Sequence, residues 1–532
     1  MSNDSAPWHT IAQLITDGCT RFADLDAMVD GDDRWTYAEY GTRIRAAGRG
    51  FLAAAMEKGD VYSIWAPNMS EWAVAALGGY LSGSVLVPIN TRFKGREAAY
   101  VLQRSRARIL FTVTEFLDTD YVAMLRAAHE TLPDLREIVV LRGPVPEGCI
   151  SFAEFIARGA THTDDALTAR SALVQPDDVC HILFTSGTTG APKGAMLVHD
   201  AVCRVYKVWS DLIGLRPGDR YLVVNPFFHS FGLHCGILVS LMKGACVIPQ
   251  AVFDVPQMME RVQAERVSML PGAPAIYQTI LNHPDLASFD LSSLRLAVTG
   301  AAAVPVELVH RMHDTLGFEV VVTGYGLTET SGTATMCRHD DDPETIANTS
   351  GRAVPDVEVK VVDADGHEVA HGEPGEIMVR GYVVMKGYLD DPEQTAAAID
   401  VDGWLHTGDI GVMDERGYLQ ITDRVKDMFI VGGFNAYPAE IESAMLRHPD
   451  IGQVAVVGVP DQRMGEVGMA FVVPKPGSQP DPQQIVAWCR EEMANYKAPR
   501  FVEIVDVFPL NPSGKVLKYE LRARGAQLHP VG

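Results

Sequence analysis

The sequence lacks most features of secreted, metal-rich or membrane-spanning proteins. Its 532 residues include eight cysteines and no CxxC pair, which argues against a disulfide framework or zinc site and favours reduced thiols. The most apolar run, "GLHCGILVSLMKGACVIP", is broken by Lys243 and Gly244 before it reaches the roughly 20 residues of a membrane span. The first residues have no basic segment followed by an apolar run, so we expect no signal peptide and a cytoplasmic protein.

Basic residues are also scarce relative to acidic ones. The chain has 45 Lys and Arg against 68 Asp and Glu, which gives a formal net charge of −23. A nucleic-acid or anionic-membrane partner therefore has little electrostatic support. Any bound polyanion has to be held by a local site. The length exceeds what one hydrophobic core usually serves, so two or more domains are expected.

The hydrophobic patterning indicates an α/β protein. From about residue 30 to 325, short apolar runs alternate with amphipathic stretches, as in layered α/β folds with a mostly parallel sheet. From about 352, "VEVKVVDADGHEV" alternates with period two around a DG turn, which predicts a small antiparallel β subdomain. The last hundred or so residues read as a separate compact α+β domain, a plausible size for an independent unit.

The loop "FTSGTTGAPKGAM" at 184–196 has the composition of a phosphate cradle. It is no Walker loop, because Pro192 precedes Lys193 and Gly194 follows it. Its glycines would let backbone N–H groups converge on an anion, and its hydroxyls and lysine would add donors. By composition alone, a polar surface turn is an equally acceptable interpretation.

Three later segments add chemistry to this loop. "TGYGLTET" (323–330) offers Tyr325, Thr328 and Glu329; "GWLHTGDIG" (403–411) places Asp409 between glycines; and "NPSGKVLK" (511–518) carries Lys515. A carboxylate such as Asp409 can accept two hydroxyl donors from a ribose. Taken singly, the three segments could equally supply a core tyrosine, a capping aspartate and a solvated lysine.

Together and in this order, the motifs resemble the adenylate-forming superfamily of acyl-CoA synthetases, adenylation domains and luciferases. The resemblance covers nearly the whole chain, from "WTYAEY" at 35–40 to "PSGKVLK". It implies a two-step reaction with ATP, Mg²⁺ and coenzyme A. A carboxylate attacks the α-phosphorus of ATP, which gives acyl-AMP and pyrophosphate, and a thiol then displaces AMP. It also implies a large N-terminal domain (1–423), a hinge (424–427) and a small mobile C-terminal domain (428–532).

The resemblance also implies roles for individual residues. Lys515, His229 and Thr328 would be catalytic, Glu329 would hold the metal, Lys426 would be the hinge pivot, and Gly432 and Gly433 would line the coenzyme A channel. The implied ATP- and AMP-binding residues are Thr185, Ser186, Gly187, Thr188, Thr189, Gly190, Lys193, Gly300, Ala301, Ala302, Thr323, Gly324, Tyr325, Gly326, Thr328, Asp409, Arg424 and Lys515. The implied acyl-binding residues are Phe228, His229, Gly232, Gly300 and Gly332.

The acyl-site segment "NPFFHSFGL" bears on the substrate. Amino-acid-activating relatives carry an aspartate where this chain has His229, and an unpaired buried ammonium would be costly. A satisfied core histidine is the alternative interpretation. Only a short tail follows Lys515, so coenzyme A is favoured over a fused carrier protein. The small and apolar residues of "PGAPAIYQ", "TGAAAVP" and "SGTATM" leave room for a bulky hydrophobic acid.

The whole chain looks most similar to actinobacterial fatty-acyl and steroid-catabolic CoA ligases, one of which activates a bicyclic indane-dione propanoate. The expected substrate is therefore a fatty acid or a bulky polycyclic propanoate, with small molecules as the partners and a homo-oligomer left open. A luciferase-like oxygenase would form the same adenylate and is not separated by these residues. A non-catalytic nucleotide or acyl sensor is disfavoured because Lys515 and Glu329 are both present.

Overall fold

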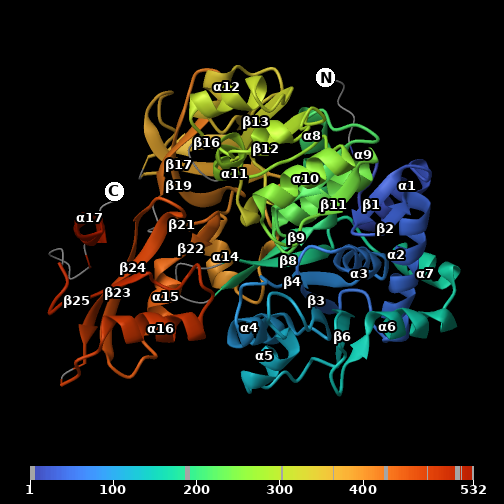
Figure 1. Ribbon diagram of the computed structural model, residues 1–532, viewed down its shortest axis with the longest axis horizontal. Helices are drawn as coiled ribbons and strands as arrows, with labels where there is room; N and C mark the ends of the chain where they lie inside the picture. Colours follow the sequence, from blue (N-terminus) through green and yellow to red (C-terminus); the bar gives the residue numbers. More distant parts are fainter. Residues whose placement is uncertain are drawn as a thin grey trace.

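The structure is a computed structural model that describes residues 6–185, 192–300, 304–363, 365–424, 429–475, 477–509, 516 and 518–529. It has a large N-terminal domain of layered sheets and helices. A small C-terminal domain, orange to red in Figure 1, lies beside it. This is the expected α/β fold class. None of the described helices is long and apolar enough to cross a membrane.

An eight-stranded sheet forms the first layer of the large domain, with strand order β18-β9-β8-β4-β3-β5-β6-β7. Its pairings from β4–β8 through to β7 are parallel, whereas β9 pairs antiparallel with β8 and with β18. The strands are β3 (Val61–Trp65), β4 (Val85–Pro88), β5 (Ile109–Val113), β6 (Glu137–Arg142), β7 (Ile150–Ser151), β8 (Val179–Thr185), β9 (Lys193–Val198) and β18 (Gly387–Tyr388). The helices of this part are α2 (Tyr37–Ala53), α3 (Ser70–Leu81), α4 (Gly95–Ser105), α5 (Tyr121–Ala127), α6 (Phe152–Arg158) and α7 (Asp164–Ser171).

The helix α3 shows why this layer is stable. All of its residues except Glu71 are buried, as expected for a helix that is apolar on every side and packs between other elements. Aromatic rings continue the core beside it, with Phe51 edge-on to Tyr62 at 4.8 Å and to Phe155 at 5.3 Å between ring centroids. Edge-to-face packing of this kind adds roughly 0.5–1.5 kcal/mol per pair beyond the buried area.

Two further four-stranded sheets form the second layer. Their strand orders are β10-β11-β1-β2 and β12-β13-β14-β15, and single bridges through Met269 connect β10 to β12. The strands are β1 (Asp26–Asp30), β2 (Asp33–Thr36), β10 (Arg220–Val223), β11 (Cys246–Pro249), β12 (Leu296–Thr299), β13 (Val320–Tyr325), β14 (Thr335–Met336) and β15 (Arg352–Ala353). The helices are α1 (Ile11–Arg21), α8 (His199–Leu212), α9 (Val239–Lys243), α10 (Val255–Glu265), α11 (Pro274–Leu281), α12 (Val306–Asp314) and α13 (Pro343–Asn348), with a π-helix at Phe231–Leu238.

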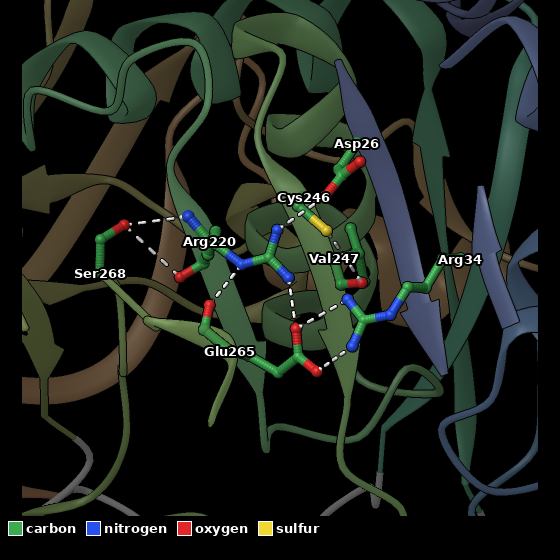
Figure 2. A network of polar contacts seen from close by, with 7 residues as sticks. All are labelled: Asp26, Arg34, Arg220, Cys246, Val247, Glu265 and Ser268. Atoms are coloured by element: carbon green, nitrogen blue, oxygen red, sulfur yellow. Dashed lines mark hydrogen bonds and ion pairs between the residues drawn. The ribbon is translucent and has the colours of Figure 1, made fainter. Parts of the chain in front are cut away.

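A network of polar contacts joins the strands of the first of these two sheets to α10 (Figure 2). Arg220 at the start of β10 donates to Asp26 at 2.9 Å and to the Glu265 carboxylate at 2.6 Å, and Arg34 also binds Glu265. The Ser268 hydroxyl accepts from the Arg220 backbone N–H at 2.9 Å. The network thus ties β1 and β2 to β10 and to the end of α10.

The predicted β subdomain is an antiparallel sheet with strand order β16-β17-β19-β20. Its elements are β16 (Val357–Val362), β17 (Pro374–Gly381), β19 (Leu405–Met413), β20 (Leu419–Arg424) and the helix α14 (Pro392–Ala398). The described residues of the small domain form a five-stranded sheet with three helices. Its elements are β21 (Phe429–Val431), β22 (Phe434–Ala436), α15 (Pro438–Met445), β23 (Ile451–Asp461), β24 (Gly465–Pro474), α16 (Pro482–Glu492), β25 (Phe501–Ile504) and α17 (Lys518–Leu528).

Candidate active site

Glu329 lies where three separate elements of the large domain meet. It belongs to a short 3-10 turn, Thr328–Thr330, that follows β13. Its Oε1 accepts from the Tyr388 hydroxyl at 2.8 Å and from the Thr185 hydroxyl at 3.4 Å. Burial and the adjacent Glu329 carboxylate raise the pKa of Tyr388, so its phenol stays a donor. The motif at 323–330 and the start of the glycine-rich loop are therefore in direct contact.

Lys193 begins β9 directly opposite Thr185, the last residue of β8. Its ammonium group binds the side chain of Gln394 and lies 5.2 Å from the centre of the Tyr388 ring. A small cleft of about 80 Å³ opens here. It is lined by Tyr100, Arg104, Phe184, Pro192, Lys193, Gly194, Tyr388, Leu389 and Asp391. Lys193 thus lies beside Tyr388, whose hydroxyl donates to Glu329.

Tyr325 and Asp409 come together from β13 and β19. The Tyr325 hydroxyl donates to Asp409 Oδ2 at 2.7 Å, and Asp409 is only 4% exposed. Asp409 is also paired in register with Arg424 on β20. Tyr325, Asp409 and Arg424, three of the residues expected to hold adenine and ribose, therefore lie close together. Thr323 makes different contacts. Its hydroxyl donates to the carbonyls of Ile346 and Thr349 and so links β13 to that segment.

Small residues shape the wall between these motifs and the expected acyl site. A Cβ on Gly326 would come within 2.4 Å of the Gly332 carbonyl oxygen. Gly332 itself has φ +96° and lies against the Tyr206 hydroxyl, which a Cβ would approach to 2.4 Å. Gly300 has φ +156°. Side chains at Gly326 and Gly332 would thus collide with backbone or with Tyr206.

The acyl-site segment enters the π-helix at Phe231–Leu238. His229 is exposed, yet desolvation by the surrounding protein lowers the pKa of its imidazole. Its Nδ1 accepts from the Phe231 backbone N–H at 3.2 Å. Phe228 is half-buried, and a Cβ on Gly232 would come within 2.1 Å of the Pro226 carbonyl oxygen.

Sequence reasoning missed a buried polar cluster behind this segment. His234 Nε2 and His181 Nε2 lie 2.8 Å apart and share one hydrogen bond, and His181 Nδ1 lies 3.1 Å from the Tyr80 hydroxyl. Burial lowers the pKa of His181 far below its usual value and that of His234 to about 3. Tyr206 packs on His234 with ring centroids 4.7 Å apart and donates to the Ser331 carbonyl at 2.9 Å. The cluster therefore supports the backbone that leads into Gly332.

In the small domain, Gly432 and Gly433 form the turn of the β21–β22 hairpin. Both have positive φ, 56° and 85°. Phe434, the next residue, lies under the Arg92 guanidinium of the large domain at 4.2 Å from its ring centre. The hairpin expected at the coenzyme A channel thus faces the large domain. Ser186, Gly187, Thr188, Thr189, Gly190, Ala301, Ala302, Lys426 and Lys515, and the side chain of Arg424, lie outside the described part.

Comparisons with known proteins show which family the chain belongs to. Residues 15–389 match the AMP-binding enzyme family and residues 440–515 match the AMP-binding enzyme C-terminal domain. The chain belongs to this family of adenylate-forming enzymes.

Its relatives include acyl-CoA ligases. A methyl-dioxo-octahydroindenyl propanoyl:CoA ligase of Rhodococcus jostii is 49% identical, over 96% of this chain and 98% of that protein. A ligase of the same name from Mycobacterium tuberculosis is 47% identical over 94% of this chain and 96% of that protein. The amide bond synthetase McbA from Marinactinospora thermotolerans has a similar structure, with a TM-score of 0.82 and 27% identity over 97% of this chain and 99% of that one. The expected class, an ATP-dependent acyl-CoA ligase, is confirmed.

Proposed function

We propose that this ligase activates a bulky bicyclic propanoate of the kind left by steroid breakdown and transfers it to coenzyme A. The observation that carries the proposal is the 49% identity, over nearly the full length, to a ligase named for such an acid. The acyl-site segment is compatible with it. His229 has a lowered pKa and brings no fixed charge to the proposed acyl site. A ketone-bearing hydrocarbon could therefore bind there without burying an unpaired charge of the protein.

For the first step, we propose that the substrate carboxylate attacks the α-phosphorus and that the bond to the bridging oxygen of pyrophosphate breaks. The glycine-rich loop with Lys193 would bind the β- and γ-phosphates, and Thr328 the α-phosphate. Lys515 would lie between the carboxylate and the nucleotide, since two anions must approach one another. Tyr325 and the backbone near Gly300 would hold the adenine, while Asp409 and Arg424 would hold the ribose. The contact between Tyr325 and Asp409 supports one continuous nucleoside site.

Mg²⁺ fits the residues around Glu329. The ion prefers oxygen ligands and takes one or two protein carboxylates together with phosphate oxygens. Glu329 is half-buried, and its carboxylate adjoins two further oxygen atoms, the hydroxyls of Thr185 and Tyr388. When bound, the ion would neutralise charge on the phosphates, with Glu329 as its protein ligand.

For the second step, the coenzyme A thiolate would attack the acyl carbonyl. A carbon–sulfur bond forms, the bond to the AMP oxygen breaks, AMP leaves with the electron pair, and the thiol proton passes to solvent. We propose that Gly432 and Gly433 line the pantetheine path, that residues 424–427 with Lys426 form the hinge, and that the domains are 1–423 and 428–532. The hairpin that contains Gly432 and Gly433 faces the large domain, which supports their assignment to the pantetheine path.

An AMP-release assay with coenzyme A tests the substrate. The panel contains the bicyclic dioxo-octahydroindenyl propanoate, medium and long fatty acids, and aryl acids. We expect the highest kcat/KM for the bicyclic acid. Among straight-chain acids, affinity should rise by about 0.8 kcal/mol per buried CH₂ until the pocket is full. If a fatty or aryl acid has the highest kcat/KM, the proposed bicyclic substrate is wrong. If amino acids are preferred, the proposal of an apolar, uncharged acyl site is wrong.

A further inference from the structure

A lysine is buried between the two domains. Lys497, just after α16 of the small domain, is 1% exposed. Its ammonium group donates to Glu440 Oε1 at 2.7 Å and to Glu97 Oε1 at 2.8 Å. Glu440 belongs to α15 of the small domain, whereas Glu97 lies in the first turn of α4 in the large domain. One cation therefore joins carboxylates from both sides of the interface.

Burial makes this contact costly to break. Desolvation alone would lower the pKa of Lys497, but the Tyr496 phenol and the carboxylates of Glu440 and Glu97 outweigh it and raise the pKa, so the lysine stays charged. The ring of Phe93 lies 4.2 Å from the ammonium group and covers it from the large-domain side. When one member of such a buried pair is removed, the remaining charge is left without compensation.

Weaker contacts surround this lysine. Arg96 donates to Glu492 across the interface at 2.9 Å, and the Arg96 side chain is 55% exposed. Arg92 lies over Phe434 of the hairpin, whose ring packs against Tyr496 at 5.0 Å between centroids. Exposed ion pairs contribute little to stability. Among the described ion pairs between the two domains, we therefore expect the buried lysine to have the largest influence on the orientation of the small domain.

In this orientation the hairpin side of the small domain faces Tyr388, the partner of Glu329 in the large domain. The Gly432–Gly433 turn precedes Phe434, and Tyr437 lies close enough to contribute to the raised pKa of Tyr388, after the larger effects of burial and Glu329. The C-terminal helix α17 packs on β23 at the far edge of the small domain, away from the large domain (Figure 1). The same helix α4 that supplies Glu97 also supplies Tyr100 and Arg104 to the cleft beside Lys193.

We propose that Lys497 is a positioning residue for the thioester step: by bridging Glu97 and Glu440 it holds the small domain with the Gly432–Gly433 hairpin over the adenylate. This inference rests on the proposed two-step function. Lys497 and Glu440 move together as parts of one domain, so a rotation of that domain breaks only one of the two ion pairs of Lys497, the pair with Glu97. The lysine thus favours one of two domain orientations without touching the substrate.

The variant Glu97→Gln tests this inference. It removes the cross-domain charge but leaves the Lys497–Glu440 pair inside the small domain. The amide oxygen can still accept the Lys94 backbone N–H that the carboxylate caps at 2.8 Å. Two half-reactions are measured separately: pyrophosphate release without coenzyme A, and thioester formation from supplied acyl-AMP, each with the acid that the wild type uses best. We expect thioester formation to slow by roughly tenfold or more, with adenylation within about twofold of wild type.

A matched control uses the exposed pair of the same interface. Glu492→Gln should change neither half-reaction by more than about twofold. Lys497→Met should reproduce the selective loss, and its melting curve shows whether the small domain still folds. An equal loss in both half-reactions, or none, for Glu97→Gln would overturn the positioning role while the ligase assignment stands. A wild type that adenylates no acid of the panel would instead overturn the proposed function, and this inference with it.

Discussion

The Tyr325 hydroxyl donates a hydrogen bond to Asp409 Oδ2 at 2.7 Å and so joins β13 to β19 across two sheets of the large domain. Asp409 is buried in a strand whose backbone is further held by the bond from its own N–H to the Thr407 hydroxyl at 3.2 Å. Burial and the bond from Tyr325 hold the carboxylate in one orientation. This suits the proposed role of Asp409 as an acceptor for ribose hydroxyls.

Asp409→Asn should weaken nucleotide binding more than acid binding. The amide keeps the volume but loses the charge-assisted acceptors for the ribose hydroxyls, which are worth about 1.5–3 kcal/mol. We expect the KM for ATP to rise by about one to two orders of magnitude, with the KM for the acid nearly unchanged. Steady-state kinetics in both substrates checks this. Tyr325→Phe is the milder comparison, since it removes one hydrogen bond and keeps the ring.

Lys515→Ala should abolish adenylation selectively. A cation between carboxylate and α-phosphate stabilises charge that develops only in the first step, so its loss should slow acyl-AMP formation by about two to three orders of magnitude. Thioester formation from supplied acyl-AMP should be largely retained. Rapid-quench measurements of both half-reactions decide the matter, and equal loss in the two would contradict the assigned role.

Lys426→Pro should show the opposite selectivity. Proline fixes φ near −65° and removes the backbone N–H, which restricts rotation at the proposed hinge. We expect adenylation close to wild type and strongly slowed transfer to coenzyme A. Lys426→Ala serves as the control because it removes the side chain without restricting the backbone. Transfer at the wild-type rate in the proline variant would show that the pivot lies elsewhere.

The sequence predicted those parts of the site that short motifs encode. Short motifs contain the glycine-rich loop, Tyr325 with Glu329, and Asp409. In each motif the residue types themselves indicate nucleotide or phosphate binding. The His181–His234 pair, 53 residues apart, and the Lys497–Glu97 pair, 400 residues apart, had no such signal. A histidine in an apolar helix or a lysine in "NYKAP" is uninformative until the fold shows which group it meets. Contacts of this kind depend on how layers and domains pack.

Two buried histidines, His199 and His234, should make the stability of the folded protein depend on pH. His199 at the start of α8 accepts the Ile11 backbone N–H on Nδ1 at 3.2 Å, and burial lowers its pKa to about 4. His234 shares one hydrogen bond with His181, and burial lowers its pKa to about 3. In the unfolded chain both groups titrate near the ordinary value of about 6.5. The folded protein therefore binds these protons less readily than the unfolded chain.

Because the unfolded chain binds these protons more readily, the free energy of unfolding should decrease in acid. Above about pH 7.5 both states are neutral at these sites, and stability is at its full value. As the pH falls below about 6.5, the unfolded chain takes up protons first, so the free energy of unfolding decreases until the folded pKa values are reached. At pH 5 each histidine should have removed about 2 kcal/mol. Urea unfolding at pH 7.5 and pH 5 measures the loss, which His199→Gln and His234→Gln should each reduce by about 2 kcal/mol, the contribution of one histidine. A wild-type stability that is the same at both pH values would contradict the neutral, buried state of these imidazoles.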